Sequence, residues 1–189
     1  MTLIASINDY RDWINPNLRP NVYAVGTLKQ RRQCHDGAIA YQMVGNYDRY
    51  DQMYSQFIRR LSIATYGRKH WRRYRELLPN CASLEGGTIS SYSKGRRHGI
   101  DPHSAKEGIR FHINMCFQRP GWIPFEQFKI EVVRTWTGMD WALPNIVVGI
   151  SSGDCVAYSL KEGPQTLLAN SMSWPLSGAS SATPNSSAC

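Results

Sequence analysis

Three stretches of the chain have the pattern of apolar and polar positions that β-strands produce. Residues 22–28 are mostly β-branched or aromatic and follow Pro20, and residues 145–150 form a short apolar run. Residues 110–117 alternate, so that successive side chains would point to opposite faces of a sheet. We therefore predict strands at these three positions, with 22–28 and 145–150 in the core, and we expect the polar segment 29–33 to leave the sheet.

Helices are predicted between these strands, because apolar residues recur there every three or four positions. From residue 50 the spacings describe one face of an amphipathic helix that packs on the core. The residues of this stripe are Tyr50, Met53, Tyr54, Phe57, Ile58 and Leu61. Residues 125–136 have a similar stripe, and residues 154–168 indicate a helix that is interrupted near Gly163 and Pro164. This order of elements predicts an α+β fold with helices packed over one face of a sheet.

The length and composition favour a single globular domain. The chain has 189 residues, 42% of them hydrophobic, which suffices for a core. We assign residues 1–168 to the domain and residues 169–189, rich in Ser, Ala and Pro, to a tail or linker. No run of apolar residues is long enough to span a membrane, and the first residues lack the pattern of a signal peptide. The expected location is therefore intracellular, in the host cytoplasm or nucleoid.

The five cysteines do not indicate a disulfide framework or a zinc ribbon. Their number is odd and no Cys-x-x-Cys pair occurs. Cys116 and Cys155 lie in apolar strings, where cysteine usually acts as a small buried hydrophobe.

Positive charge is concentrated in one part of the chain. The formal net charge is +8, which suits a polyanion such as nucleic acid, although many soluble proteins are simply basic. Seven of the 22 Lys and Arg residues lie between Arg59 and Arg75, interleaved with aromatic residues. Cations neutralise phosphates and rings stack on unpaired bases, whereas the simpler interpretation is a solvated helix end. Including a second basic loop at 94–98, the predicted DNA contacts are Arg68, Lys69, Trp71, Arg72, Arg73, Arg75, Arg96 and Arg97.

Three residues have the chemistry of a divalent-metal site. Glu85 precedes two glycines, toward the end of an expected strand. His112 and Asn114 are two apart in the alternating strand, which puts both side chains on one face. A carboxylate, an imidazole and an amide oxygen could hold Mg²⁺ or Mn²⁺. The simpler alternative for His112 is a hydrogen-bonded structural residue.

A candidate nucleophile follows near the end of the domain. Tyr158 and Lys161 are three apart and would share a helix face. A tyrosine can attack a phosphodiester when a metal polarises the phosphate and a cation stabilises the developing charge. Tyr-x-x-Lys also arises often by chance.

The order of these pieces resembles the replication-initiator (Rep) branch of the HUH endonuclease superfamily, over roughly residues 20–165. Residues 22–28 look like the first family motif, and Phe-His-Ile-Asn at 111–114 looks like the second, which usually reads His-hydrophobic-His. Tyr158-Ser-Leu-Lys161 looks like the third motif. Asn114 stands where a second histidine is usual and some branches carry glutamine.

The loop histidines His98 and His103 are the residues that would complete the metal site if Asn114 did not. Glu85 occupies the place of the family's acidic metal ligand. The chain has no Gly-x-x-x-x-Gly-Lys-Ser/Thr phosphate loop, so we expect any helicase to be a host protein or a further, fused domain.

The resemblance implies a central antiparallel sheet flanked by helices, of the HUH or RRM-like type. It implies an enzyme that nicks and rejoins single-stranded DNA, or a DNA hairpin, at a replication origin of a phage, plasmid or small circular virus. Glu85, His112 and Asn114 would hold the metal, Tyr158 would form a 5′-phosphotyrosine, and Lys161 would assist the tyrosine.

Three alternatives stay open. One is a single-stranded nucleic-acid-binding protein with a decayed metal site, which binds by stacking and charge without catalysis. Another is a structural or interaction protein whose charge is incidental. The third is a transposase or relaxase of the same superfamily, which would share the chemistry.

Overall fold

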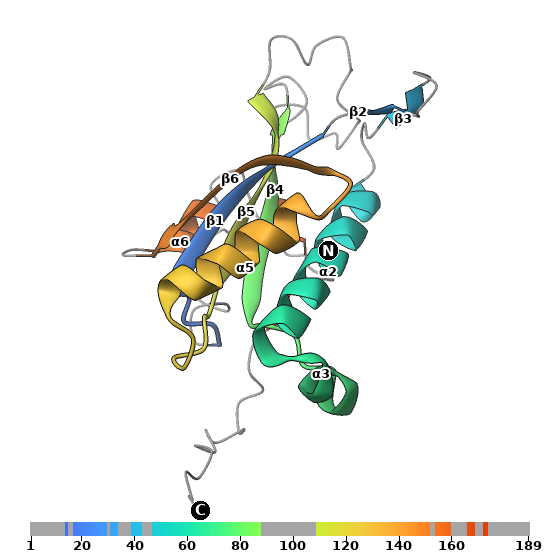
Figure 1. Cartoon of the computed structure of the whole chain (residues 1–189). Coiled ribbons are helices and arrows are strands. Elements are labelled where there is room, and N and C mark those ends of the chain that lie inside the picture. The colour runs from blue at the N-terminus through green and yellow to red at the C-terminus, as the bar shows by residue number, and fades with distance from the viewer. Residues whose placement is uncertain are drawn as a thin grey trace, which may run out of the picture.

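An antiparallel sheet of four strands forms the centre of the molecule (Figure 1). The computed structural model describes residues 14, 17–29, 31–33, 39–42, 47–87, 109–151, 154–159, 166–168 and 172–173. The strands are β1 (Val22–Leu28), β4 (Asn80–Gly87), β5 (Ile109–Phe117) and β6 (Ala142–Ile150). They lie in the order β4-β5-β1-β6, and each neighbouring pair is antiparallel. The predicted strands are therefore present, within an α+β fold.

Residues 31–33 leave this sheet, as the polar character of 29–33 predicts. They form β2 (Arg31–Gln33), which pairs with β3 (Ile39–Gln42) in a separate two-stranded sheet.

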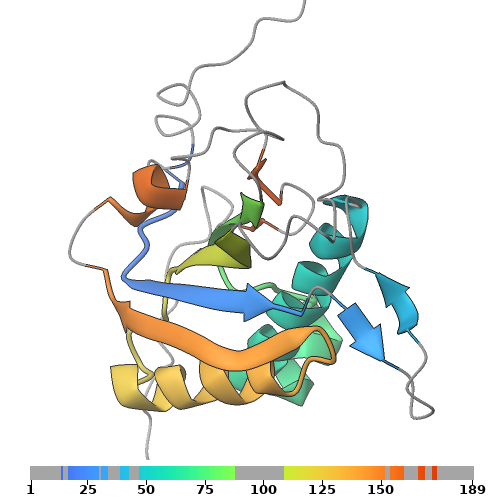
Figure 2. The same cartoon turned by 90° about the horizontal axis from the view of Figure 1, so that it is seen from above.

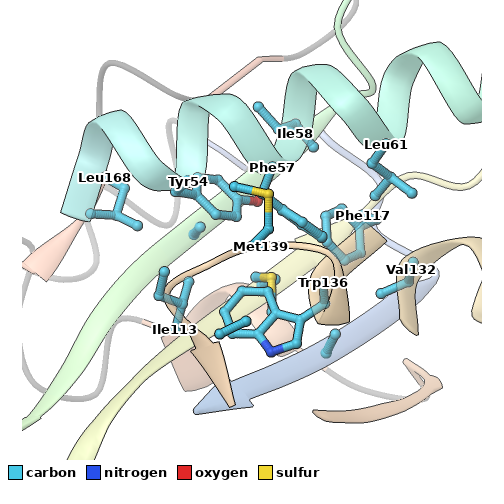
Figure 3. Packing of buried hydrophobic residues seen from close by; sticks show 14 of the residues in the cluster. Tyr54, Phe57, Ile58, Leu61, Ile113, Phe117, Val132, Trp136, Met139 and Leu168 are labelled. Atoms are coloured by element: carbon cyan, nitrogen blue, oxygen red, sulfur yellow. The ribbon is translucent and has the colours of Figure 1, made fainter. Parts of the chain in front are cut away.

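Two long helices cover one face of the four-stranded sheet, which Figures 1 and 2 show from two directions. They are α2 (Tyr47–Tyr66) and α5 (Phe125–Thr137). The apolar stripe predicted in α2 is buried, and Figure 3 shows Phe57 of this stripe packed against Trp136 of α5, with ring centroids 5.4 Å apart. Together these side chains make the main core, whose burial is the main stabilising term of the fold.

Gly26 of β1 is required by the close packing of Trp136. A Cβ atom at position 26 would lie 2.3 Å from Trp136 Cζ2, much closer than carbon atoms approach one another. The indole nitrogen Nε1 of Trp136 donates a hydrogen bond to the Leu143 carbonyl oxygen at 2.9 Å. This bond ties α5 to β6 and holds the ring over the glycine.

The opposite face of the sheet carries a smaller helix, α6 (Cys155–Ser159). Val156 of α6 belongs to a second apolar cluster with Ile14, Leu18, Cys81, Cys116 and Leu167. The sheet therefore has helices on both faces: α2 and α5 provide the predicted cover of one face, and α6 adds a helix on the other.

Two predictions from the pattern of apolar residues are wrong. Residues 145–150 form a strand at the edge of the sheet rather than a core strand, with Val147 and Ile150 60% and 62% exposed. An apolar run does not reveal whether both faces of a strand are covered. The helix predicted over 154–168 does not reach its expected end, because Leu167 makes an antiparallel bridge to Ser83. Proline cannot continue a helix, and Pro164 precedes this bridge.

No helix among the described residues is long and apolar enough to cross a membrane.

Candidate active site

Glu85 and His112 lie directly opposite each other on neighbouring strands. Glu85 of β4 pairs in register with His112 of β5, and opposed residues of an antiparallel pair project from the same face. His112 Nε2 is 3.5 Å from Glu85 Oε2. The Glu85 carboxylate is fully buried, whereas the His112 side chain is 16% exposed. The pair therefore has one buried acidic partner and one that solvent or a ligand can reach.

Asn114 is the next residue of β5 on the same face, opposite Ser83 of β4. Its side chain is 2% exposed. Within the part of the chain that the structure describes, neither its oxygen Oδ1 nor its nitrogen Nδ2 has a hydrogen-bond partner. A buried amide group without partners costs about 1–3 kcal/mol. Such a group is unusual in a folded protein and suggests a role in holding a ligand.

The donor set of these residues fits a divalent metal ion. It comprises the Glu85 carboxylate, the His112 imidazole and the Asn114 amide oxygen, which suit Mg²⁺ or Mn²⁺. Ser83 Oγ donates to Glu85 Oε1 at 3.5 Å, a long contact that helps to orient the carboxylate. The described ranges contain no cluster of three His, Cys, Asp or Glu residues that could hold a metal. A metal ion held here would need the Asn114 amide as its third ligand.

Thr27 and Ser83 belong to the same sheet surface and were not singled out from the sequence as site residues. Thr27 of β1 lies opposite His112 on its other side, so a polar row of Glu85, His112 and Thr27 crosses three strands. Ser83 is one alternation step before Glu85. The two-residue period within each strand could have indicated both, but only the register between strands places Thr27 beside His112 and Ser83 beside Asn114.

Tyr158 lies on α6, which packs on the same face of the sheet as the Glu85–His112 pair. Ser159 Oγ is 3.3 Å from Cys116 Sγ, and Cys116 is one alternation step beyond Asn114. This contact is about 13 Å from His112 along β5, since four residues of a strand rise by ~3.3 Å each. Tyr158 is 56% exposed, so its phenol is accessible to solvent. Lys161 lies outside the described residues.

The first turn of α6 is fixed by Asp154. The Ala157 backbone N–H donates to Asp154 Oδ1 at 2.9 Å, and the Tyr158 N–H donates to the Asp154 carbonyl oxygen at 3.2 Å. A carboxylate in this position satisfies a free N–H group and favours the helix. Asp154 therefore positions the short helix that carries the tyrosine.

Three cysteines lie where α6 packs on the sheet. Cys81 and Cys116 are buried and opposite each other in register, and Cys155 of α6 is half-buried; none of them is in a disulfide. A hydrogen bond from Cys116 lowers the pKa of Cys155, and the same bond together with burial raises the pKa of Cys116. The prediction of a small buried hydrophobe is confirmed for Cys116, while Cys155 is more exposed than predicted.

The basic residues of 68–75 lie away from this surface. They form α3 (Arg68–Tyr74), which buries none of its residues. Arg68, Lys69, Arg72, Arg73 and Arg75 are exposed and Trp71 is half-buried. The segment leads into the first residue of β4, Asn80, whereas Glu85 is near the other end of that strand. Figure 1 shows α3 at the end of the molecule where β4 begins. Arg96, Arg97, His98 and His103 lie outside the described residues.

Comparisons of the chain with protein-family models, with curated proteins and with solved structures give no match.

Proposed function

We propose that this chain nicks and rejoins single-stranded DNA at a replication origin, as a metal-dependent endonuclease of the HUH replication-initiator type. One observation carries the proposal. The Glu85–His112 pair and the buried, unpartnered amide of Asn114 lie on the sheet face that also carries α6 with its exposed Tyr158. Phosphodiester transfer through a phosphotyrosine requires metal-ligating side chains and a tyrosine that reach the same phosphate. The shared face supports this arrangement, although the contact of α6 with β5 is about 13 Å from His112 along the strand.

Glu85, His112 and Asn114 are the residues that would hold the ion, Mg²⁺ or Mn²⁺. When bound, the ion supplies Lewis-acid polarisation of the scissile phosphate. The protein contributes a buried carboxylate, which brings negative charge to the site, and a partly exposed imidazole. The Ser83 hydroxyl limits the orientations of the Glu85 carboxylate.

Tyr158 is the proposed nucleophile. Its oxygen loses its proton and attacks the phosphorus, the bond from phosphorus to the 3′ oxygen breaks, and the 3′ oxygen leaves as a hydroxyl. The 5′ end of the downstream strand is then linked to the tyrosine. Reverse attack by a 3′ hydroxyl rejoins a strand and releases the phenol. A free phenol has a pKa of about 10, so a nearby cation is needed to favour its ionised form. Lys161 has this role in the proposal, on the strength of its spacing from Tyr158 in the sequence.

Covalent capture tests the proposal. Wild-type protein is incubated with Mn²⁺ and a library of single-stranded DNA labelled at the 3′ end, since the 3′ fragment stays on the protein. We expect a labelled protein band on a denaturing gel for the wild type and none for Tyr158→Phe. Tyr74→Phe is the matched control, because Tyr74 is equally exposed, at 56%, but lies on α3. An unchanged adduct in Tyr158→Phe would rule out the assigned nucleophile.

The second candidate is a single-stranded nucleic-acid-binding protein without catalysis. One observation favours it: α3 and Arg75, the residue that follows it, expose five cationic side chains. Binding to the same library with no covalent adduct, in Mn²⁺ or Mg²⁺, would establish this function instead.

A further inference from the structure

A line of four aromatic rings runs from the loop after β5 to the end of α3. Trp122 is followed by Tyr66 at 6.5 Å between ring centroids, His70 at 5.2 Å from Tyr66, and Tyr74 at 4.7 Å from His70. The two rings at the ends are open to solvent, with Trp122 66% and Tyr74 56% exposed. Both end rings therefore present faces on which a planar ligand group can stack.

Arginine side chains lie over two rings of α3, those of Tyr74 and Trp71. The Arg73 guanidinium lies over Tyr74, 5.2 Å from the ring centroid, and Arg59 and Arg75 each lie 5.7 Å from the centroid of Trp71. Arg75 has a left-handed backbone conformation, and its N–H donates to the Trp71 carbonyl oxygen at 3.0 Å, which ends α3 and brings this arginine over the indole. The cations are therefore held in place rather than dispersed in solvent.

The segment that carries this charge contains no acidic residue of its own. Residues 59–75 contain no Asp or Glu, and the next residue, Glu76, bonds His70 at 2.6 Å. We call the exposed set the α3 surface; it comprises Arg68, Lys69, Arg72, Arg73, Tyr74, Arg75 and Trp122.

The α3 surface lies at the end of the sheet opposite to the Glu85–His112 pair. Residues 75–79 lead from α3 into Asn80, which pairs with Phe117, and the loop with Trp122 follows Phe117. Asn80 and Glu85 are about 17 Å apart along β4, at ~3.4 Å per residue. In addition, α3 follows α2, which covers the face of the sheet away from α6 (Figures 1 and 2).

We propose that the α3 surface binds single-stranded nucleic acid as a site separate from the Glu85–His112 pair. Arginines neutralise backbone phosphates, and the rings of Tyr74 and Trp122 stack on bases, which is the combination that binds single strands. The proposed function enters this inference only in naming the Glu85–His112 pair as the nicking site. A single strand that engages both sites would span at least about five nucleotides, since stacked nucleotides rise by ~3.4 Å.

The chemistry of α3 favours a nucleic acid over an anionic membrane. A helix that lies in a bilayer surface needs a broad apolar face. The seven residues of α3 are Arg-Lys-His-Trp-Arg-Arg-Tyr, with no aliphatic residue, and Trp71 is only half-exposed between two arginines. Planar rings next to guanidinium groups match the faces of bases and the phosphates between them.

Salt-dependent binding tests the proposal. The ligand is a dye-labelled single-stranded oligonucleotide of mixed sequence and ~20 nucleotides, a length that exceeds the span of both sites. Its affinity is measured by fluorescence anisotropy in EDTA over a range of salt concentrations. Loss of two phosphate contacts in Arg72→Ala/Arg73→Ala should reduce the slope of log affinity against log salt by about 1.4. Lys129→Ala/Arg134→Ala on α5 removes the same charge and should leave the slope unchanged.

The stacking rings have a different signature. Tyr74→Ala and Trp122→Ala should each weaken binding about tenfold, without changing the salt slope, because a stacked base contributes energy without releasing counterions. All these side chains are exposed, so unchanged melting temperatures would confirm that the variants fold.

Equal slopes for the α3 variant, the α5 variant and the wild type would overturn the proposal. Binding to vesicles rich in phosphatidylserine that is lost in the α3 variant, while oligonucleotide binding is retained, would assign the surface to a membrane. EDTA removes divalent metal, so these binding measurements do not depend on nicking. A negative covalent-capture result would not change the interpretation of the salt slopes, and equal salt slopes would not change the interpretation of the covalent capture.

Discussion

Replacing Asn114 with leucine should stabilise the metal-free protein, which is the opposite of what most substitutions of buried polar residues do. The side chain is 2% exposed and, among the described residues, both its polar atoms lack hydrogen-bond partners. Leucine has a similar shape and removes the cost of burying the amide. We expect the free energy of unfolding in EDTA to rise by about 1–3 kcal/mol.

Asn80 provides the matched control on the neighbouring strand. It is fully buried, but its amide is satisfied, since Tyr54 Oη donates to Oδ1 at 3.0 Å and Nδ2 donates to the Leu78 carbonyl oxygen at 2.9 Å. Asn80→Leu breaks both bonds and leaves two buried partners unsatisfied. It should lower the free energy of unfolding by about 2–5 kcal/mol.

Urea denaturation followed by circular dichroism measures both variants. Addition of Mn²⁺ at a hundred times its dissociation constant should stabilise the wild type by about 2.7 kcal/mol, and Asn114→Leu should lose most of this gain. If Asn114→Leu instead destabilises the metal-free protein as Asn80→Leu does, the Asn114 amide has a structural hydrogen-bonding role, and the inferred ligand position is wrong.

Three further predictions concern the packing, the thiols and α6. Gly26→Ala should lower the free energy of unfolding by roughly 1–3 kcal/mol, seen as a lower melting temperature, because its Cβ would overlap Trp136. Burial raises the pKa of the Cys81 thiol from 9.0 to about 12. The thiol therefore ionises at lower pH in the unfolded chain than in the folded protein, and the free energy of unfolding should fall as pH rises from about 9 to 12. Urea denaturation at each pH should show a smaller fall for Cys81→Ala. Asp154→Ala should cost about 1 kcal/mol through loss of the bond from the Ala157 N–H, and Asp154→Asn should restore most of this in the same assay.

The sequence allowed much of the fold to be predicted, because strands and helices have local periodicities. The alternation of β5 placed His112 and Asn114 on one face, and the register of β1 and β5 agrees. The stripe of α2 was likewise correct. The strands that pair with β5 could not be predicted in this way, because nothing local in the sequence indicates that β4 and β1 lie on its two sides.

This limitation explains which parts of the site were missed. Thr27 and Ser83 join the polar surface only through pairing between strands that are distant in the chain. The position of α3 relative to Glu85 depends on the length and direction of β4, so the sequence could not show that the basic segment and the Glu85–His112 pair lie at opposite ends of the sheet. The exposure of Val147 follows from β6 lying at the edge of the sheet, which its apolar composition does not reveal.

The most direct measurement of the central claim is identification of the amino acid that becomes linked to DNA. Wild-type protein is incubated with Mn²⁺ and the single-stranded library, the captured adduct is digested with protease and nuclease, and the modified peptide is sequenced by mass spectrometry. We expect a nucleotide joined through its 5′ phosphate to Tyr158, and no such adduct in EDTA. No adduct, or an adduct on another residue, would contradict the proposed function.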